Sequence, residues 1–196
     1  MNFEADDDLA SFLNFVGRIA EPFKAPAALG RDRFSYSDEL DGQLQRSGYF
    51  SAVTEPGLGP VAAVAMVHEL AQLPVCAEIA ASALVQPVIC PDLPRPLAVI
   101  WGSRERPARF LPMARSVISV QGDAVMSASL DPDQVRVVDS LFAYPMGVLR
   151  DPHSLTWKTV ESASVAGLER LWRLGVAAEI TGNLQGALTS VTAYVT

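Results

Sequence analysis

Apolar residues near the C-terminus recur in steps of three and four, and this spacing predicts one long helix from Leu168 to Thr196. The expected apolar face consists of Leu168, Leu171, Leu174, Ala178, Thr181, Leu184, Leu188, Val191 and Val195. Gly175, Gly182 and Gly186 fall near one side, where missing side chains let another backbone or a flat ligand come close. Tight helix packing is the simpler interpretation. We also expect so long an apolar helix to contact partners outside this chain, which would make the protein oligomeric.

The first ninety residues also show helical patterns. A first amphipathic helix carries Asp6, Asp7 and Asp8 at its N-terminus and ends before Pro22. The starts and stops predicted for the other helices are a cap at Ser37, a stop at Gly48, a start at Pro60 and a start at Pro74. This part of the chain is therefore predicted to be an all-helical domain.

The composition changes after Pro91, where short runs rich in Val and Ile alternate with prolines and a Gly-Asp pair. Val117 to Leu130 is predicted to form a hairpin that turns at Gln121-Gly122-Asp123. The fold class is therefore α+β. We predict an N-terminal helical domain at 1–92, a small β domain at 93–162, and the first helix of a C-terminal helical domain at 163–196, with the rest of that domain outside the chain.

Composition and charge narrow the classes of function. At 196 residues and 49% hydrophobic content the chain can bury a core, and its net charge of -7 argues against a nucleic-acid surface. The acidic N-terminus does not resemble a signal peptide, and the longest apolar run, Ile79 to Cys90, is too short to span a membrane. A soluble, cytoplasmic protein is expected. Cys76 and Cys90 suggest reduced thiols, with a disulfide as the open alternative.

Several short motifs have ordinary explanations. Gly57 to Ala62 matches a G-x-G-x-x-A dinucleotide fingerprint, but the region lacks a βαβ unit, so a helix-opening turn is favoured. His68-Glu69 begins like a zinc helix, yet Gln72 stands where the second histidine would be needed. His153 follows a proline in a predicted loop and has no recognisable nucleophile. No metal site is predicted.

Five stretches, in the same order along the chain, resemble the acyl-CoA dehydrogenase family. They are the opening helix after Met1-Asn2-Phe3, SDELDGQLQRSGYF from Ser37, VHELAQLPVCAEIAA from Val67, RPARFLPMARSVISVQGDAVMSASL from Arg106, and GVAAEITGNLQGALTSVTAYV from Gly175. The last resembles the family pattern AAE-x-x-G-x-x-x-x-AL-x-x-x-x-x-Y. Together these stretches cover nearly the whole chain.

The resemblance implies a flavoprotein oxidoreductase of lipid metabolism. In that family a carboxylate removes the α-proton of an acyl-CoA thioester while the β-hydride passes to FAD, leaving a trans-2-enoyl thioester. The family's flavin loop, T-E-P-x-x-G-S-D, is reduced here to VIWGSRERPARF, and the TEP at Thr54 lies in the predicted helical domain. The flavin site is thus expected to be degenerate, with FAD bound only together with a partner subunit.

The resemblance also suggests site residues on the last helix. In one branch of the family a catalytic Glu immediately precedes an Arg on this helix; here Trp172 occupies the Glu position and Arg173 matches the Arg. Glu169 lies one turn earlier and is the candidate base. Arg173 is the candidate contact to the CoA part of a substrate, with a surface salt bridge as the alternative.

Three interpretations follow. The favoured one is a subunit of an acyl-CoA dehydrogenase, such as half of a mixed α2β2 assembly that oxidises CoA thioesters of steroid side chains. The second is a non-enzymatic scaffold or acyl-CoA-binding partner with the same fold. The third is a chain truncated from an ordinary, fully catalytic dehydrogenase.

Overall fold

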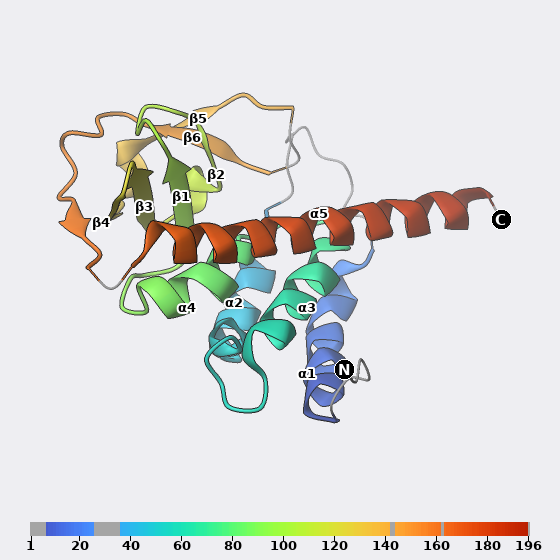
Figure 1. The fold of residues 1–196 in the computed structure, drawn as a ribbon. Helices are drawn as coiled ribbons and strands as arrows, with labels where there is room; N and C mark the ends of the chain where they lie inside the picture. Colours follow the sequence, from blue (N-terminus) through green and yellow to red (C-terminus); the bar gives the residue numbers. More distant parts are fainter. Residues whose placement is uncertain (1–6, 26–35, 142–143, 162, 196) are drawn as a thin grey trace.

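The computed structural model describes residues 7–25, 36–141, 144–161 and 163–195. Within these residues a helical region is followed by two small sheets and a long returning helix, so the predicted α+β class is confirmed (Figure 1). The predicted domain boundary at 92 lies between the helical region and the strands, and the one at 162 lies between the strands and the final helix. The division into three domains stays a prediction. None of the helices in the described ranges is both long and apolar enough to cross a membrane.

In the described residues the helical region comprises four α-helices, one π-helical turn and two 3-10 helical turns, η1 (Glu21–Phe23) and η2 (Tyr49–Ser51). Its α-helices are α1 (Asp7–Ala20), α2 (Asp38–Arg46), α3 (Gly59–Ala71) and α4 (Gln86–Ile89), and a π-helical turn, η3 (Ala81–Val85), leads directly into α4. As predicted, Ser37 caps α2 by accepting a hydrogen bond from the Leu40 N–H, and Gly48 follows it with a φ of 73°. Asp6 of the predicted acidic cluster lies outside the described residues; Asp7 and Asp8 stand in the first turn of α1.

The predicted helix from Pro74 begins later than expected. The chain from 74 to 79 is not helical, because the Ser37 N–H donates to the Cys76 carbonyl at 2.8 Å and holds the two segments side by side. Helix starts only at Ala80, after Glu78, whose carboxylate accepts the N–H groups of Ala81 and Ser82. The π-helical turn precedes Pro87, which has no backbone N–H to donate to the hydrogen bonds of a regular helix.

Two sheets follow, and in the described part of the chain they contain seven strands. Their bounds are β1 (Leu97–Trp101), β2 (Ala108–Arg109), β3 (Ser116–Gln121), β4 (Ala124–Ser129), β5 (Val135–Val138), β6 (Met146–Leu149) and β7 (Lys158–Thr159). One sheet has the order β1-β3-β4-β7 and the other β2-β6-β5. The predicted hairpin is confirmed: Gln121 pairs with Ala124 across Gly122-Asp123, and Gly122 has a φ of 57°.

Strands β1 and β3 of the first sheet are buried on both faces. Ala98, Ile100, Val117 and Ala128 belong to a core shared with residues of the second sheet. The alternate positions Leu97, Val99, Ile118 and Val120 pack with residues of η3, α4 and the start of the long final helix. Successive side chains of a strand point to opposite faces of the sheet, so alternate residues enter two different cores.

The final helix, α5, runs from Val165 to Val195 and packs most extensively against α3. A Cβ on Gly182 would lie 2.3 Å from the His68 carbonyl oxygen, and one on Gly186 would lie 2.5 Å from the Gln72 carbonyl oxygen. The glycines therefore serve tight helix packing, as the simpler interpretation held.

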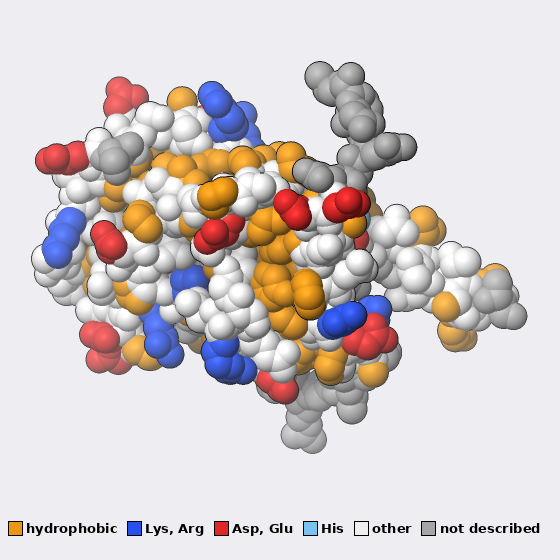
Figure 2. Space-filling view, turned by 90° about the horizontal axis from the view of Figure 1, so that it is seen from below, with side chains coloured by type: hydrophobic (Ala, Val, Ile, Leu, Met, Phe, Trp, Pro, Cys, Tyr) orange, Lys and Arg blue, Asp and Glu red, His pale blue; other side chains and the backbone are white. Residues whose placement is uncertain are grey.

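The predicted single apolar face of α5 is wrong in part. Leu168, Leu171 and Ala178 pack inward together with the glycines, but Leu184 and Leu188 are more than half exposed. α3 comes so close to α5 that only small residues fit between the two helices. The larger apolar side chains in the second half of α5 therefore point away from α3. Figures 1 and 2 show this half of α5 projecting from the body of the molecule with hydrophobic side chains on its surface.

Candidate functional site

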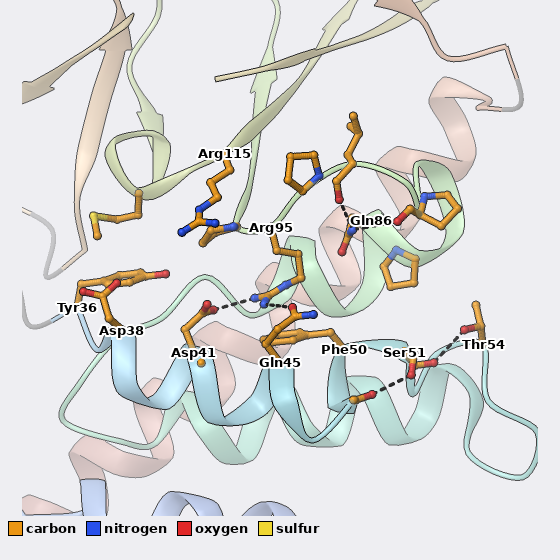
Figure 3. A pocket seen from close by; sticks show the side chains of 18 residues that line it. Tyr36, Asp38, Asp41, Gln45, Phe50, Ser51, Thr54, Gln86, Arg95 and Arg115 are labelled. Atoms are coloured by element: carbon orange, nitrogen blue, oxygen red, sulfur yellow. Dashed lines mark hydrogen bonds and ion pairs between the residues drawn. The ribbon is translucent and has the colours of Figure 1, made fainter. Parts of the chain in front are cut away.

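A cavity of about 910 Å³ lies between the helical region and the proline-rich linker that leads into β1 (Figure 3). One wall is the face of α2 that carries Asp38, Asp41 and Gln45. The opposite wall is the segment 91–96, and Arg115, just before β3, also lines the cavity. Because its lining comes from both regions, the cavity belongs to the junction between them.

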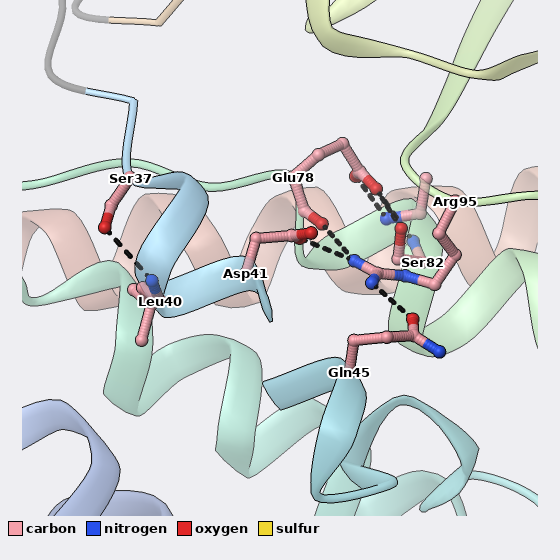
Figure 4. A network of polar contacts seen from close by, with 8 residues as sticks. Ser37, Leu40, Asp41, Gln45, Glu78, Ser82 and Arg95 are labelled. Atoms are coloured by element: carbon pink, nitrogen blue, oxygen red, sulfur yellow. Dashed lines mark hydrogen bonds and ion pairs between the residues drawn. The ribbon is translucent and has the colours of Figure 1, made fainter. Parts of the chain in front are cut away.

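Arg95 lines this cavity and joins the linker to the helical region (Figure 4). Its guanidinium donates to Asp41 Oδ1 at 2.8 Å, to Gln45 Oε1 at 2.7 Å and to the Glu78 carbonyl at 3.3 Å. The same group lies 3.2 Å from the centroid of the Phe50 ring. The Arg95 side chain is 7% exposed and that of Asp41 is 16% exposed, so this ion pair is largely withdrawn from water.

Glu78 lies behind Arg95 and is fully enclosed, with 1% of its surface exposed. Its carboxylate accepts hydrogen bonds from the Ala81 N–H at 2.9 Å, the Ser82 N–H at 3.1 Å and the Ser82 hydroxyl. Burial raises the pKa of the Glu78 carboxyl to about 7, against the opposing effects of the Ser82 hydrogen bond and the Arg95 charge. The nearby Glu179 raises this pKa further. Glu78 is thus a buried acid that titrates near neutral pH.

This raised pKa makes stability depend on pH. The folded protein holds the Glu78 proton up to about pH 7, whereas the unfolded chain releases it near the ordinary carboxyl pKa of 4.5. The free energy of unfolding is therefore expected to fall as pH rises between these two values, by on the order of 3 kcal/mol for this group. Glu78→Gln, which cannot ionise, should remove that part of the fall, as measured by urea unfolding at several pH values.

The control for this prediction is Glu105→Gln, a change at an exposed carboxylate. It should leave the pH dependence of the wild type unchanged. An E78Q protein that loses stability with pH as steeply as the wild type would contradict the assignment.

A second buried ion pair joins β2 to α5. The guanidinium of Arg109 donates to Glu179 Oε2, and the two side chains are 17% and 13% exposed. Arg109 also lies 5.1 Å from the ring centroids of Phe110 and Tyr144 and 5.4 Å from that of Trp172. Burial alone would lower the pKa of Arg109, but the carboxylates of Glu179 and Glu78 outweigh it and raise the pKa. Arg109 therefore stays charged.

Arg95, Glu78, Arg109 and Glu179, with Asp41, form a charged junction at which the helical region, the sheets and α5 meet. Each guanidinium in it faces a carboxylate from another element. The Arg95–Asp41 and Arg109–Glu179 ion pairs each join two of these parts, so the junction fixes their relative position. No group of three or more metal-binding side chains occurs in the part of the chain that the structure describes.

The structure places the two predicted site residues on the outer side of α5. Arg173 Nη2 lies 2.5 Å from Glu169 Oε1, and the side chains are 76% and 40% exposed. Neither residue lines the cavity. Trp172 instead packs with the core beside α5 and with Arg109. The catalytic role of Glu169 and the substrate role of Arg173 stay predictions.

The segment expected to correspond to the flavin loop is a short turn after β1. Gly102 has a φ of 77°, and Arg104 folds back over the sheet. Its guanidinium donates to Ser119 Oγ at 3.1 Å and lies 3.9 Å from the centroid of the Trp157 ring. Arg104 thereby occupies the surface beside the turn. Thr54, of the TEP sequence in the helical region, lines the cavity instead.

Sequence reasoning missed the charged junction. One signal was present: Glu78 and Glu179 are single acidic residues within otherwise apolar stretches, and Arg95 stands between two prolines. Buried charges are rare unless they are paired, so such isolated charges are candidates for internal ion pairs. Their partners could not be predicted from local sequence, because Arg95 and Asp41 are 54 residues apart along the chain and Arg109 and Glu179 are 70 apart.

Neither the protein-family models nor the curated proteins give a match to this chain. Solved structures do. The butyryl-CoA dehydrogenase from Megasphaera elsdenii superposes with a TM-score of 0.64 and 16% identity, over 99% of this chain and 70% of the other. The ChsE4-ChsE5 complex from Mycobacterium tuberculosis gives a TM-score of 0.66 and 16% identity, over 99% of this chain and 68% of the other. The chain therefore has the fold of the acyl-CoA dehydrogenases, as its sequence motifs suggested.

Proposed function

We propose that this chain is a subunit of an acyl-CoA dehydrogenase assembly that supports α,β-dehydrogenation of an acyl-CoA thioester. The observation that carries the proposal is the similarity of fold along 99% of the chain to a butyryl-CoA dehydrogenase and to a two-component complex. A CoA thioester of a steroid side chain is the substrate class that the sequence resemblance favours, and the cytoplasm is the proposed location.

A partner subunit is part of the proposal because two arrangements among the described residues argue against a complete site in this chain. The turn after β1 is covered by Arg104, and Glu169 is held by Arg173 on an exposed helix surface. We assign the FAD site to a pair of subunits of the same fold and the catalytic base to the partner subunit. In that pair this chain supplies the sheets, α5 and the charged junction that holds them together.

The test is to purify this chain alone and together with a second acyl-CoA dehydrogenase-type subunit, and to record the visible flavin spectrum. Flavin is expected in the pair only, and it should bleach when acyl-CoA is added. Glu169→Gln in the pair should lower turnover by less than about threefold, since the base is assigned to the partner; a loss of roughly 100-fold or more would place it on this chain. Absence of flavin from both preparations would contradict the proposal.

The alternative function is a non-enzymatic scaffold or acyl-CoA-binding partner. It is favoured by the exposed Glu169–Arg173 pair, since Arg173 at 76% exposure is accessible to a CoA phosphate. Calorimetry separates the two functions. Binding of acyl-CoA that Arg173→Ala weakens, in a complex that never acquires flavin, would support the alternative.

A further inference from the structure

The cavity between α2 and the linker combines a polar end with an apolar lining. Figure 3 shows the side chain of Arg115 across the cavity from Asp38 and Asp41. The apolar part of the lining comes from the ring of Phe50 and from four residues of α4 and the linker, which are Pro87, Pro91, Leu93 and Pro94. A volume of about 910 Å³ is within the range of small-molecule sites. We call the apolar residues the proline wall.

The polar groups of the proline wall are already hydrogen-bonded within the chain. The Gln86 amide donates to the Leu93 carbonyl at 2.6 Å and to the Pro91 carbonyl at 3.4 Å. The Pro94 carbonyl accepts the Ser116 hydroxyl at 2.6 Å. Proline itself has no N–H to satisfy. An apolar body can therefore cover this wall without leaving its carbonyls unpaired.

The polar end of the cavity offers hydrogen-bond donors to a ligand. Arg115 is exposed and has no ion pair with any of the described residues. Gln45 Oε1 accepts from Arg95 at 2.7 Å, so the amide N–H groups of Gln45 stay available. A guanidinium binds a carboxylate through two parallel hydrogen bonds, and a neutral amide N–H can add a third.

The carboxylates at this end already have stabilising neighbours. Asp41 is paired with Arg95, and Asp38 stands in the first turn of α2, where the N–H groups of the helix favour a negative charge. Two donors have no such neighbour, because the Tyr36 hydroxyl and Arg95 Nε are buried without a hydrogen-bond partner among the described residues. Most of the unsatisfied groups here are thus donors, which favour a negatively charged acceptor.

We propose that this cavity binds an amphipathic monocarboxylate, with its carboxylate on Arg115 and Gln45 and its apolar body along the proline wall. A fatty acid and a steroid acid share this chemistry. The proposal adds a second ligand and does not depend on the proposed function. Since a CoA thioester no longer has a free carboxylate at that carbon, the cavity would respond to the free acid and not to the thioester.

The experiment is isothermal titration calorimetry of the purified chain with decanoate and, separately, with cholate. Binding of decanoate alone would identify a linear acid, binding of cholate alone a steroid acid, and either result supports the proposal. Arg115→Gln should weaken binding by roughly 10- to 100-fold, because it removes the charge-assisted hydrogen bonds. Circular dichroism should show that this variant keeps the helix content of the wild type.

The matched control is Arg136→Gln, which removes the same charge from an exposed position on β5 outside the cavity. It should bind the acid like the wild type. Equal weakening by the two variants would show general charge attraction and would overturn the proposal. So would a failure of both acids to bind at millimolar concentration. Decylamine has the same alkyl body with a cation, and binding of decylamine as tight as that of decanoate would show that the carboxylates select the ligand instead.

Discussion

Gly182→Ala is expected to destabilise the protein by about 2 kcal/mol, although alanine is the better helix former. The new Cβ would lie 2.3 Å from the His68 carbonyl oxygen and 2.8 Å from Ala71 Cβ, so α3 and α5 must move apart. Overpacking of this kind costs about 1–3 kcal/mol, whereas the gain in helix propensity is about 1 kcal/mol at most. The contact is with a backbone atom that no rotamer change can withdraw, so the loss should dominate. Urea or thermal unfolding measures the difference.

Gly17→Ala is the matched control for this prediction. Gly17 lies inside α1, and a Cβ there would meet nothing within 4 Å. The same substitution should therefore stabilise the protein by about 0.5–1 kcal/mol through helix propensity alone. If Gly182→Ala also stabilised the protein, the close packing of α5 on α3 would be wrong.

Arg95→Ala is expected to cost about 3 kcal/mol in the free energy of unfolding. The variant leaves Asp41, at 16% exposure, without its cation and removes the guanidinium from the Phe50 ring. Removal of one partner from a buried ion pair costs roughly 3–5 kcal/mol, and the lower end applies because Asp41 borders the cavity and can gain water. Equilibrium unfolding in urea measures the loss.

The control is Arg173→Ala, which breaks the ion pair with Glu169 on the surface. Arg173 is 76% exposed, so its loss should change the free energy of unfolding by less than about 1 kcal/mol. Similar effects of the two substitutions would show that the junction around Arg95 is not a buried ion pair. Asp41→Asn in the Arg95→Ala background should recover part of the loss, since it removes the unpaired charge.

The charged junction matters for the proposed function because it sets the position of α5 relative to the sheets. In the proposed assembly, α5 and the sheets must keep a fixed distance for a site shared with a second subunit to form. Arg95 and Arg109 hold that distance by reaching across the boundaries between the three parts. Their ion pairs are therefore positioning contacts, and their loss should weaken assembly as well as stability.

Local signals in the sequence determined much of the secondary structure. Ser37 capped its helix, Gly48 ended it, and Gly122-Asp123 turned the hairpin, because each effect arises within a few residues. The order of a helical region, strands and a long helix also followed from the change of hydrophobic period near Pro91. This order, with the quoted motifs, was enough to predict the acyl-CoA dehydrogenase fold.

When local signals conflicted with contacts between distant segments, the tertiary contacts determined the structure. Pro74 predicted the start of a helix, but pairing of Ser37 with Cys76 kept that segment extended. On α5, hydrophobicity favoured burial of Leu184 and Leu188, yet the glycine side was buried because the backbone of α3 comes too close for a larger side chain. The ion pairs of Arg95 and Arg109 join residues that only folding brings together. The sequence alone thus determined the elements and their order, whereas the packing of backbones and the pairing of buried charges determined the site.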